Sequence, residues 1–263
     1  MKGTKGRADV TIGNATTGQY ILITGASSGI GRELAIQMSQ QHKLILNGRD
    51  AARLLETQQA CFEPASHLIW KFDLSRVDEL DESFTKFLKE KQVPVMAFVH
   101  CAAVLEILPL KSLSVEATRK TFNTNFFSAM ELTRLLTKKM VNDRQLRSIV
   151  FISSIASMFG ARGFSAYSAS KGALDALMKS LSVELAPNVR INSVLPGGVR
   201  THMTDTIYED PTMAERLERD YPLGIGRAAD VVNAVEFLIS EKSRWITGQQ
   251  IVVDGGRTVN ITA

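Results

Sequence analysis

Short apolar runs alternate with longer amphipathic stretches along most of this chain of 263 residues. The short runs are rich in Val, Ile, Leu and Phe, as is typical of strands that are buried on both faces of a sheet. The longer stretches carry apolar residues at helical spacing. This alternation predicts βαβ units, and therefore an α/β fold in which helices cover both faces of a parallel sheet.

The predicted elements follow one another without an internal repeat or a low-complexity linker. Residues 1–18 are rich in Lys, Gly and Thr and lack the apolar middle of a signal peptide, so we expect a flexible leader or an expression remnant there. Residues 19–263 are expected to form one domain. Within it, residues 199–221 lack a strand pattern, and a long excursion after a strand is where a substrate lid would lie. We expect strands at 20–23, 43–47, 67–72, 95–100, 148–153, 189–195 and 249–253, helices that begin near 29 and 77, and helices at 51–60, 115–140, 165–186 and 229–240.

Composition narrows the class of partner. Hydrophobic residues make up 44% of the chain and charged residues 22%, which suits a soluble globular protein, and the two cysteines suggest a reducing cytoplasm as the simplest setting. Cys61, Cys101 and the isolated histidines form neither a disulfide framework nor a metal-binding pattern, so no metal is expected. The net charge of +4 keeps nucleic-acid binding as an alternative, but the basic residues form no run, so we expect no nucleic-acid partner. No segment approaches the roughly 18 apolar residues of a membrane span, so we expect no membrane partner.

A glycine-rich turn, TGASSGIG at residues 24–31, joins the first predicted strand to the first helix. Such a turn lets the backbone approach a phosphate, and the helix points its free N–H groups and the positive end of its dipole at the anion. The pattern therefore indicates a dinucleotide site in a Rossmann-type, three-layer, doubly wound fold with a seven-stranded parallel sheet. Its expected cofactor contacts are Gly25, Ser27, Ser28, Gly29, Ile30 and Gly31.

The residues after the second predicted strand set the expected cofactor preference. In dinucleotide folds an acidic side chain here binds the ribose hydroxyls of NAD, whereas an arginine accommodates the 2′-phosphate of NADP. Gly48 stands where the acid is expected, and Arg49 follows it. We therefore expect NADP(H) in preference to NAD(H), unless Arg49 only solvates a turn or the Asp50 carboxylate faces the ribose instead.

Two further polar residues each admit two roles. Asp73, which precedes Leu74 at the end of the third predicted strand, is placed either to accept a hydrogen bond from an adenine amino group or to cap the helix that begins near Val77. Asn125 falls within an apolar helical stretch. Its buried amide needs partners, so it is either a satisfied core group or part of an active-site relay.

Candidate chemistry centres on Tyr167 and Lys171, which are four residues apart and share one face of a predicted helix. A free tyrosine has a pKa near ~10, but an adjacent ammonium favours the phenolate, and the phenol then becomes useful for proton transfer. Ser154 ends the preceding strand, where its hydroxyl can bond the oxygen of a carbonyl or alcohol. These groups describe a site that moves a proton while another group moves a hydride. A Tyr-x-x-x-Lys pair also occurs by chance in many helices, so its surroundings must decide.

Those surroundings form an ordered set of motifs. They are TGASSGIG at 24–31, the last asparagine of NTN at 125, ISS at 152–154, YSASK at 167–171, LPGGVRT at 195–201 and WITGQQIVVDGG at 245–256. In order and spacing they resemble the short-chain dehydrogenase/reductase family, in its single-domain form, over about residues 18–257. Within that family the chain is most similar to 3-oxoacyl-[acyl-carrier-protein] reductases and to general carbonyl reductases.

The resemblance implies a role for each matched residue. Tyr167 would be the general acid/base, and Lys171 would lower its pKa and hold the nicotinamide ribose. Ser154 would polarise the substrate oxygen, and Asn125 would hold a water in the proton relay. Besides the glycine turn, Tyr167 and Lys171, the implied cofactor contacts are Arg49, Asp73, Leu74, Cys101, Ala102, Pro196, Gly197, Val199 and Thr201.

One segment departs from the family pattern. Where the family usually has Asn-Asn-Ala-Gly after the fourth strand, this chain has His100-Cys101-Ala102-Ala103. Cysteine cannot supply the hydrogen bonds of an asparagine amide, and Ala103 adds a side chain. We expect altered cofactor contact there with the catalytic set intact, and His100 to be a packed or hydrogen-bonded residue rather than a new base.

The function we expect is NADPH-dependent reduction of a ketone or aldehyde with Tyr167 as proton donor. A 3-oxoacyl thioester is one candidate substrate. A sugar, polyol or steroid-like alcohol is the alternative, and an NADP(H)-sensing binding protein without catalysis is the alternative of another class. By analogy with the family we expect a homotetramer or homodimer built on the helices at 115–140 and 165–186. Four basic side chains have two possible roles: they either bind an acidic acyl carrier protein or only solvate a helix end. They are Lys138, Lys139, Arg144 and Arg147.

Overall fold

Parallel strands in the order β3-β2-β1-β4-β5-β6-β7 form the centre of the structure. The computed structural model describes residues 19–201, 204 and 211–260. The leader expected at 1–18 and part of the expected lid region lie outside the described residues. The prediction of a seven-stranded parallel sheet is confirmed. The strands are β1 (Tyr20–Thr24), β2 (Lys43–Gly48), β3 (Leu68–Lys71), β4 (Val95–His100), β5 (Ser148–Ile152), β6 (Arg190–Pro196) and β7 (Gln250–Val253).

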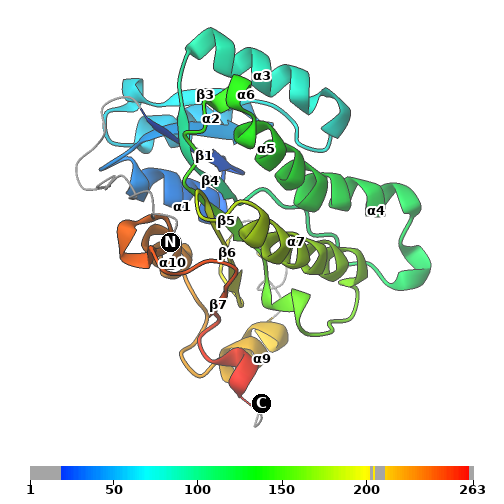
Figure 1. Cartoon of the computed structure of the whole chain (residues 1–263). Helices are drawn as coiled ribbons and strands as arrows, with labels where there is room; N and C mark the ends of the chain where they lie inside the picture. Colours follow the sequence, from blue (N-terminus) through cyan, green and yellow to red (C-terminus); the bar gives the residue numbers. More distant parts are fainter. Residues whose placement is uncertain (1–18, 202–203, 205–210, 261–263) are drawn as a thin grey trace, which may run out of the picture.

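Helices cover both faces of this sheet and make the three layers visible in Figure 1. One helical layer consists of α1 (Gly29–Met38), α2 (Ala51–Ala60) and α10 (Ala228–Ile239). The other contains α3 (Leu80–Lys91), α4 (Val115–Phe122), α5 (Ser128–Thr137), α6 (Lys139–Asn142) and α7 (Ser165–Glu184). The remaining described α-helix, α9 (Pro211–Asp220), follows β6 and lies near the C-terminal end in Figure 1.

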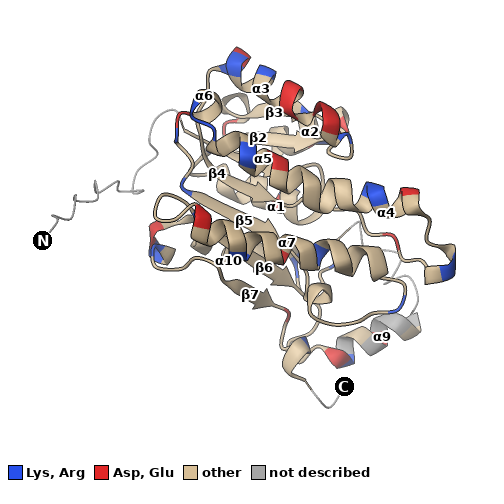
Figure 2. Cartoon of the chain, turned by 45° about the vertical axis from the view of Figure 1, so that its right-hand side comes forward, with Lys and Arg blue, Asp and Glu red and all other residues tan. Residues whose placement is uncertain are grey.

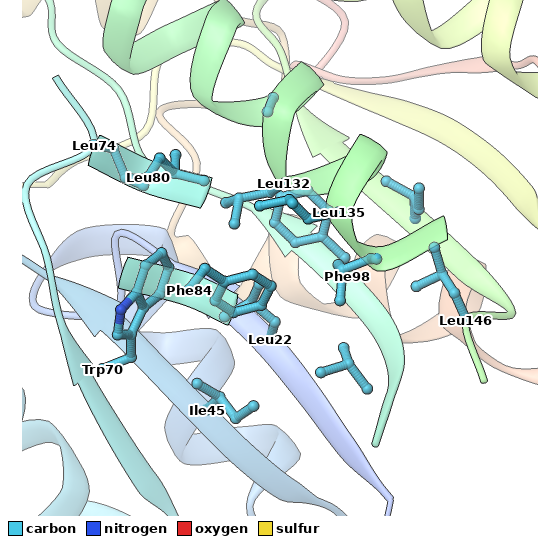
Figure 3. Close-up of a cluster of buried hydrophobic side chains, with 14 of the residues drawn as sticks. Leu22, Ile45, Trp70, Leu74, Leu80, Phe84, Phe98, Leu132, Leu135 and Leu146 are labelled. Atoms are coloured by element: carbon cyan, nitrogen blue, oxygen red, sulfur yellow. The ribbon is translucent and has the colours of Figure 1, made fainter. Parts of the chain in front are cut away.

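The core is divided in two by the sheet, because successive side chains of a strand point to opposite faces. In β1, Ile21 and Ile23 pack with α1 and α10, whereas Leu22 packs on the other face. Figure 3 shows that second cluster, where Leu22 lies with Trp70 and Phe84. Burial on both faces is the physical reason for the near-continuous apolar runs in the sequence.

The helix expected over 115–140 is interrupted, which corrects that prediction. α4 ends at Phe122, and a π-helical turn, Asn123–Phe127, separates it from α5. A second break follows α5, where Lys138 has an extended backbone (φ −68°, ψ 125°) before the single turn of α6. Residues 115–140 contain neither Gly nor Pro, so the sequence carries no helix-breaking signal at either interruption.

Most other boundaries fall within two residues of the predicted ones. The helix expected near residue 77 is the exception, since a 3₁₀ turn at Val77–Glu79 precedes α3. In Figure 2 basic and acidic segments are interspersed, and α3 carries acidic residues in its first turn and lysines in its last, as the helix dipole favours. None of the helices in the described part of the chain is long and apolar enough to cross a bilayer.

Candidate active site

A cleft of about 1870 Å³ opens at the carboxyl ends of the strands. Neighbouring strands β1 and β4 lead into connections on opposite faces of the sheet, and such a switch point is where open α/β sheets bind ligands. The cleft exceeds the roughly 300–1,000 Å³ of an ordinary ligand pocket, so it has room for a dinucleotide together with a second molecule. Of the catalytic and cofactor residues expected from the sequence, all except Asn125 line this one cleft.

The glycine turn lies on the floor of the cleft. Gly25 and Gly29 have φ of +69° and +54°, a region that side chains other than glycine rarely adopt. A Cβ on Gly25 would lie 2.8 Å from the backbone of Ala102, so the turn packs directly on the segment that follows β4. α1 then begins at Gly29, and the Ser28 side chain makes no capping bond to its first N–H groups. The turn therefore fits the phosphates of a dinucleotide.

Asp50 lines the cleft beside Arg49, and its carboxylate is engaged in local contacts. Its Oδ1 accepts hydrogen bonds from the backbone N–H of Ala52 at 3.0 Å and of Arg53 at 3.2 Å, so it caps α2. Arg49 is exposed at the cleft, and no acidic side chain among the described residues forms an ion pair with it. A Cβ on Gly48 would meet Leu54 at 3.2 Å, which leaves little room for an acid there.

Asp73 holds a local turn. Its Oδ1 accepts a hydrogen bond from the backbone N–H of Ser75 at 2.9 Å, and it does not cap the turn at Val77–Glu79. Burial alone raises the pKa of Asp73, but the hydrogen bonds of Ser75 and the positive charges of Arg49 and Lys120 outweigh it and hold that pKa below its usual value. Asp73 is thus an ionised acceptor at the wall of the cleft, beside buried Leu74.

His100 and Cys101 leave the backbone of their segment in place. His100 is fully buried, and its Nδ1 lies 2.9 Å from the Thr24 hydroxyl, which accepts the backbone N–H of Ala102 at 3.3 Å. His100 thus joins Thr24 to the start of the segment that follows β4, and its Nε2 is buried without a hydrogen-bond partner among the described residues.

The pKa values of both residues lie far from neutral, which argues against an acid–base role for either. Burial, helped by the charge of Lys171, lowers the pKa of His100 to about 3. Burial also raises the pKa of the Cys101 thiol to about 12, so this group at the cleft wall stays protonated. The departure from the family pattern thus supplies a structural histidine and a neutral thiol.

Tyr167 and Ser154 face each other across the cleft wall. Tyr167 comes from the first turn of α7, and Ser154 from the loop after β5, where its hydroxyl accepts the backbone N–H of Ala156 at 3.1 Å. Burial raises the pKa of Tyr167 to about 12, against the opposing hydrogen bond with Ser154. In the free protein the pKa of Tyr167 lies above its ordinary value, because desolvation outweighs the hydrogen bond with Ser154. The phenol is protonated at neutral pH.

Lys171 is almost fully buried one turn beyond Tyr167. Its ammonium donates a hydrogen bond to the backbone carbonyl of Ile152 at 2.7 Å and lies 5.7 Å from the centroid of the Tyr167 ring. Burial lowers the pKa of Lys171 to about 8, and the negative charge of Asp175 opposes this shift. Asp175 lies a further turn along α7, is 3% exposed, and neither of its carboxylate oxygens has a hydrogen-bond partner among the described residues.

Asn125 lies behind the cleft, inside the π-turn. Its Oδ1 accepts the backbone N–H of Val104 at 2.7 Å, and its Nδ2 donates to the carbonyl of Val104 and to the Ser170 hydroxyl, both at 3.0 Å. The amide is thus satisfied by protein groups and joins the loop after β4 to α7. This position is compatible with a satisfied core group and also with a part in the active-site relay. The relay remains possible because the π-turn alters the pattern of backbone carbonyls.

The family model described as enoyl-(acyl carrier protein) reductase matches residues 25–258, which is most of the chain. The chain belongs to the short-chain dehydrogenase/reductase family. It is accordingly an oxidoreductase that acts on alcohol or carbonyl groups with a nicotinamide dinucleotide.

Named relatives in this family cover nearly the whole chain. D-erythrulose reductase of Gallus gallus is 31% identical over 248 residues, which are 92% of this chain and 97% of the relative. Carbonyl reductase [NADPH] 2 of Sus scrofa is 32% identical over 246 residues, or 91% and 96%. The solved structure of 4-hydroxyisoleucine dehydrogenase complexed with NADH has a TM-score of 0.86 and 27% identity, and the match covers 92% of this chain and 99% of that one.

The structure adds residues to the cleft of this family member that the sequence analysis missed. Some come from loops and from α9, whose approach to the sheet no local pattern reveals. Others, such as Arg53, belong to predicted helices, and nothing in the sequence indicates that their side chains reach the cleft. These additional lining residues include Arg53, Ser75, Lys120, Thr124, Ile107, Phe159, Arg162, Phe164, Leu217, Tyr221 and Arg257.

Proposed function

We propose that this protein is an NADP(H)-dependent reductase that converts a small-molecule ketone or aldehyde into an alcohol, and catalyses the reverse reaction with the same groups. The observation that carries the proposal is the convergence of a protonated Tyr167, Ser154 and buried Lys171 on one side of a cleft whose floor is the glycine turn. Bound NADPH supplies the hydride. The chain supplies the proton and the polarisation of the oxygen.

Each catalytic residue acts through a specific atom of its side chain. The hydroxyl of Ser154 accepts the N–H of Ala156, so its own proton is free for the substrate oxygen. The Tyr167 phenol, protonated at neutral pH, donates its proton to that oxygen as reduction proceeds. The Lys171 ammonium stabilises the phenolate that remains and binds the ribose hydroxyls of the cofactor. Both amide protons of Asn125 are used in hydrogen bonds to Val104 and Ser170, so this residue contributes to the proton relay by holding Val104 and α7 in place. A water molecule of the relay would then bind to the backbone of the π-turn.

The cofactor contacts follow from the walls of the cleft. Arg49 binds the 2′-phosphate, and Asp73 accepts a hydrogen bond from the adenine amino group. On the other side Val199 and Thr201 face the nicotinamide, and Thr201 closes the cleft toward the turn, since a Cβ on Gly29 would lie 3.4 Å from it. Leu74, Ala102, Cys101, Pro196 and Gly197 line the space between these groups.

The relatives favour a sugar- or polyol-type substrate over a 3-oxoacyl thioester, since one of them is named as a reductase of erythrulose and another as a carbonyl reductase. We further propose that the region 199–221 acts as a lid, because Leu217 and Tyr221 at the end of α9 line the cleft. A homo-oligomer that pairs α4, α5 and α7 of two copies, and a cytoplasmic location, complete the proposal.

Arg49→Ala is expected to raise the NADPH dissociation constant about 10- to 100-fold and to leave NADH binding almost unchanged. The reason is the loss of a charged hydrogen bond to the 2′-phosphate, worth on the order of 1.5–3 kcal/mol. Parallel fluorescence titrations of both variants with NADPH and NADH measure this. Arg53→Ala, which removes a second cationic side chain from the same wall, is the matched control. An unchanged preference in Arg49→Ala would remove Arg49 from the phosphate site.

Asp175→Asn is expected to move the alkaline limit of NADPH binding toward lower pH. The Asp175 charge raises the pKa of Lys171 against the effect of burial, so without it Lys171 becomes neutral below its present pKa of about 8. NADPH titrations from pH 6 to 10 locate the midpoint. The exposed Glu184→Gln on the same helix controls for a general change in charge. A midpoint that stays in place, or moves to higher pH, would contradict the coupling.

A further inference from the structure

The substrate side of the cleft has an apolar wall beside the reacting groups. Two loops build it: Ile107 belongs to the loop after β4, and Phe159 and Phe164 belong to the loop before α7. The Phe164 ring lies 6.1 Å from the ring of Tyr167, nearly perpendicular to it, so this wall is continuous with the proton donor. Ile155, which directly follows Ser154, also lines the cleft.

The two loops are held against each other. The backbone N–H of Leu108 donates a hydrogen bond to the carbonyl of Gly163 at 3.0 Å. Gly163 has a φ of +81°, and a Cβ there would lie 2.8 Å from Ile107 Cγ2. This close approach fixes the apolar wall as a built part of the site.

The apolar side chains of this wall remain open to the cleft. Phe159 is 49% exposed and Ile107 45% exposed. Large apolar side chains that stay exposed in a concave site gain from contact with an apolar ligand. The wall thus offers hydrophobic contact within reach of Tyr167.

Polar groups on the facing wall are largely paired with one another. Arg257 forms an ion pair with the buried Asp220 at 3.5 Å, and the Asn260 amide donates to the backbone carbonyl of Asp220 at 3.3 Å. The Tyr221 hydroxyl accepts the backbone N–H of Gly198 at 2.7 Å. Arg162 is an exception without an ion pair among the described residues, but its exposed position places it at the rim of the cleft. The Tyr221 hydroxyl keeps its own proton, but Asp220 and Arg257 are already paired, so among the described residues a substrate hydroxyl finds fewer partners on this side than an apolar group finds on the apolar wall.

We propose that the substrate carries an apolar branched, cyclic or aromatic group beside its carbonyl, and that this site discriminates against polyhydroxylated ketones. The proposal rests on the proposed reductase function and narrows it, since the sugar-type substrate suggested by the relatives is then disfavoured. Buried hydroxyls without partners lower transition-state binding, whereas each apolar group that fits such a pocket raises it by roughly 10- to 200-fold. Polar groups of the substrate are tolerated at the rim, near Arg162.

The test compares NADPH oxidation by cyclohexanone and acetophenone with that by L-xylulose and erythrulose, using the full chain at neutral pH. We expect kcat/KM to be at least about 10-fold higher for the apolar ketones. Equal or higher kcat/KM for the sugars would overturn the substrate class and leave the reductase function standing. If none of the four ketones oxidised NADPH, the proposed function would fail and the substrate class with it.

Variants locate the effect in the wall. Phe159→Asn and Ile107→Asn are expected to lower kcat/KM for cyclohexanone about 10-fold or more, mainly through KM, and to leave the NADPH dissociation constant unchanged. Met158→Asn is the matched control, because Met158 is 53% exposed next to Phe159 but does not line the cleft. Equal effects of Met158→Asn and Phe159→Asn, or no effect of either wall variant, would overturn the assignment of the wall to substrate.

Discussion

Tyr167→Phe is expected to abolish carbonyl reduction, with kcat lower by about 10²–10⁴-fold, while the NADPH dissociation constant changes little. The substitution keeps the ring and removes only the hydroxyl. The pKa of Tyr167 is about 12 in the free protein, so the phenol holds its proton at neutral pH and is the group that can give it to the substrate oxygen. Ser154 remains to polarise the oxygen, but it has no comparable means of delivering a proton.

Two measurements separate catalysis from binding in this variant. Single-turnover oxidation of NADPH with saturating ketone gives the chemical step, and a fluorescence titration gives cofactor affinity. Tyr20→Phe makes the same change at a buried tyrosine in β1 that does not line the cleft, and it is expected to leave kcat unchanged. Retained turnover in Tyr167→Phe would remove the phenol from the role of proton donor.

The sequence predicts the sheet well because its strands are recorded in local pattern. Leu22, Ile45 and Phe98 lie on one face of the sheet and their neighbours on the other, so each buried strand appears as an unbroken apolar run. The glycine turn is equally local, since a strand, three glycines and a helix lie within a dozen positions. The position of the cleft can also be predicted from the sequence, because the carboxyl ends of parallel strands lie at the same edge of the sheet.

The sequence predicts less well whatever depends on the direction of a side chain or on the balance of desolvation and charge. That the Asp50 carboxylate caps α2 depends on a rotamer, and the sequence alone is compatible with other orientations of this side chain. The pKa of Tyr167 lies above its ordinary value in the free protein, because burial of the phenol has a larger effect than its hydrogen bond with Ser154. The contribution of Asp175, one turn behind Lys171, becomes visible only once both side chains are found buried together.

Gly31→Ala is expected to raise the NADPH dissociation constant at least about 10-fold and to destabilise the protein by about 1–3 kcal/mol. Here the requirement is space rather than backbone angle. A Cβ on Gly31 would lie 2.3 Å from the backbone oxygen of Gly25 and 2.8 Å from its carbonyl carbon, and neither backbone atom can move without opening the turn. The added methyl group therefore pushes α1 away from the loop whose N–H groups face the phosphates.

Gly172→Ala provides the control, because Gly172 also lies in a helix, and its added Cβ would meet only the Ser157 carbonyl oxygen at 4.0 Å. Alanine is the better helix former by about 1 kcal/mol, so that variant should keep NADPH affinity and unfold at the same or a higher temperature. Thermal unfolding with and without NADPH measures both effects for the two variants. Suppose that Gly31→Ala lost stability but was still stabilised by NADPH as much as the unchanged protein. The close contact of Gly31 with Gly25 would then be needed for the fold and not for cofactor binding, contrary to this prediction.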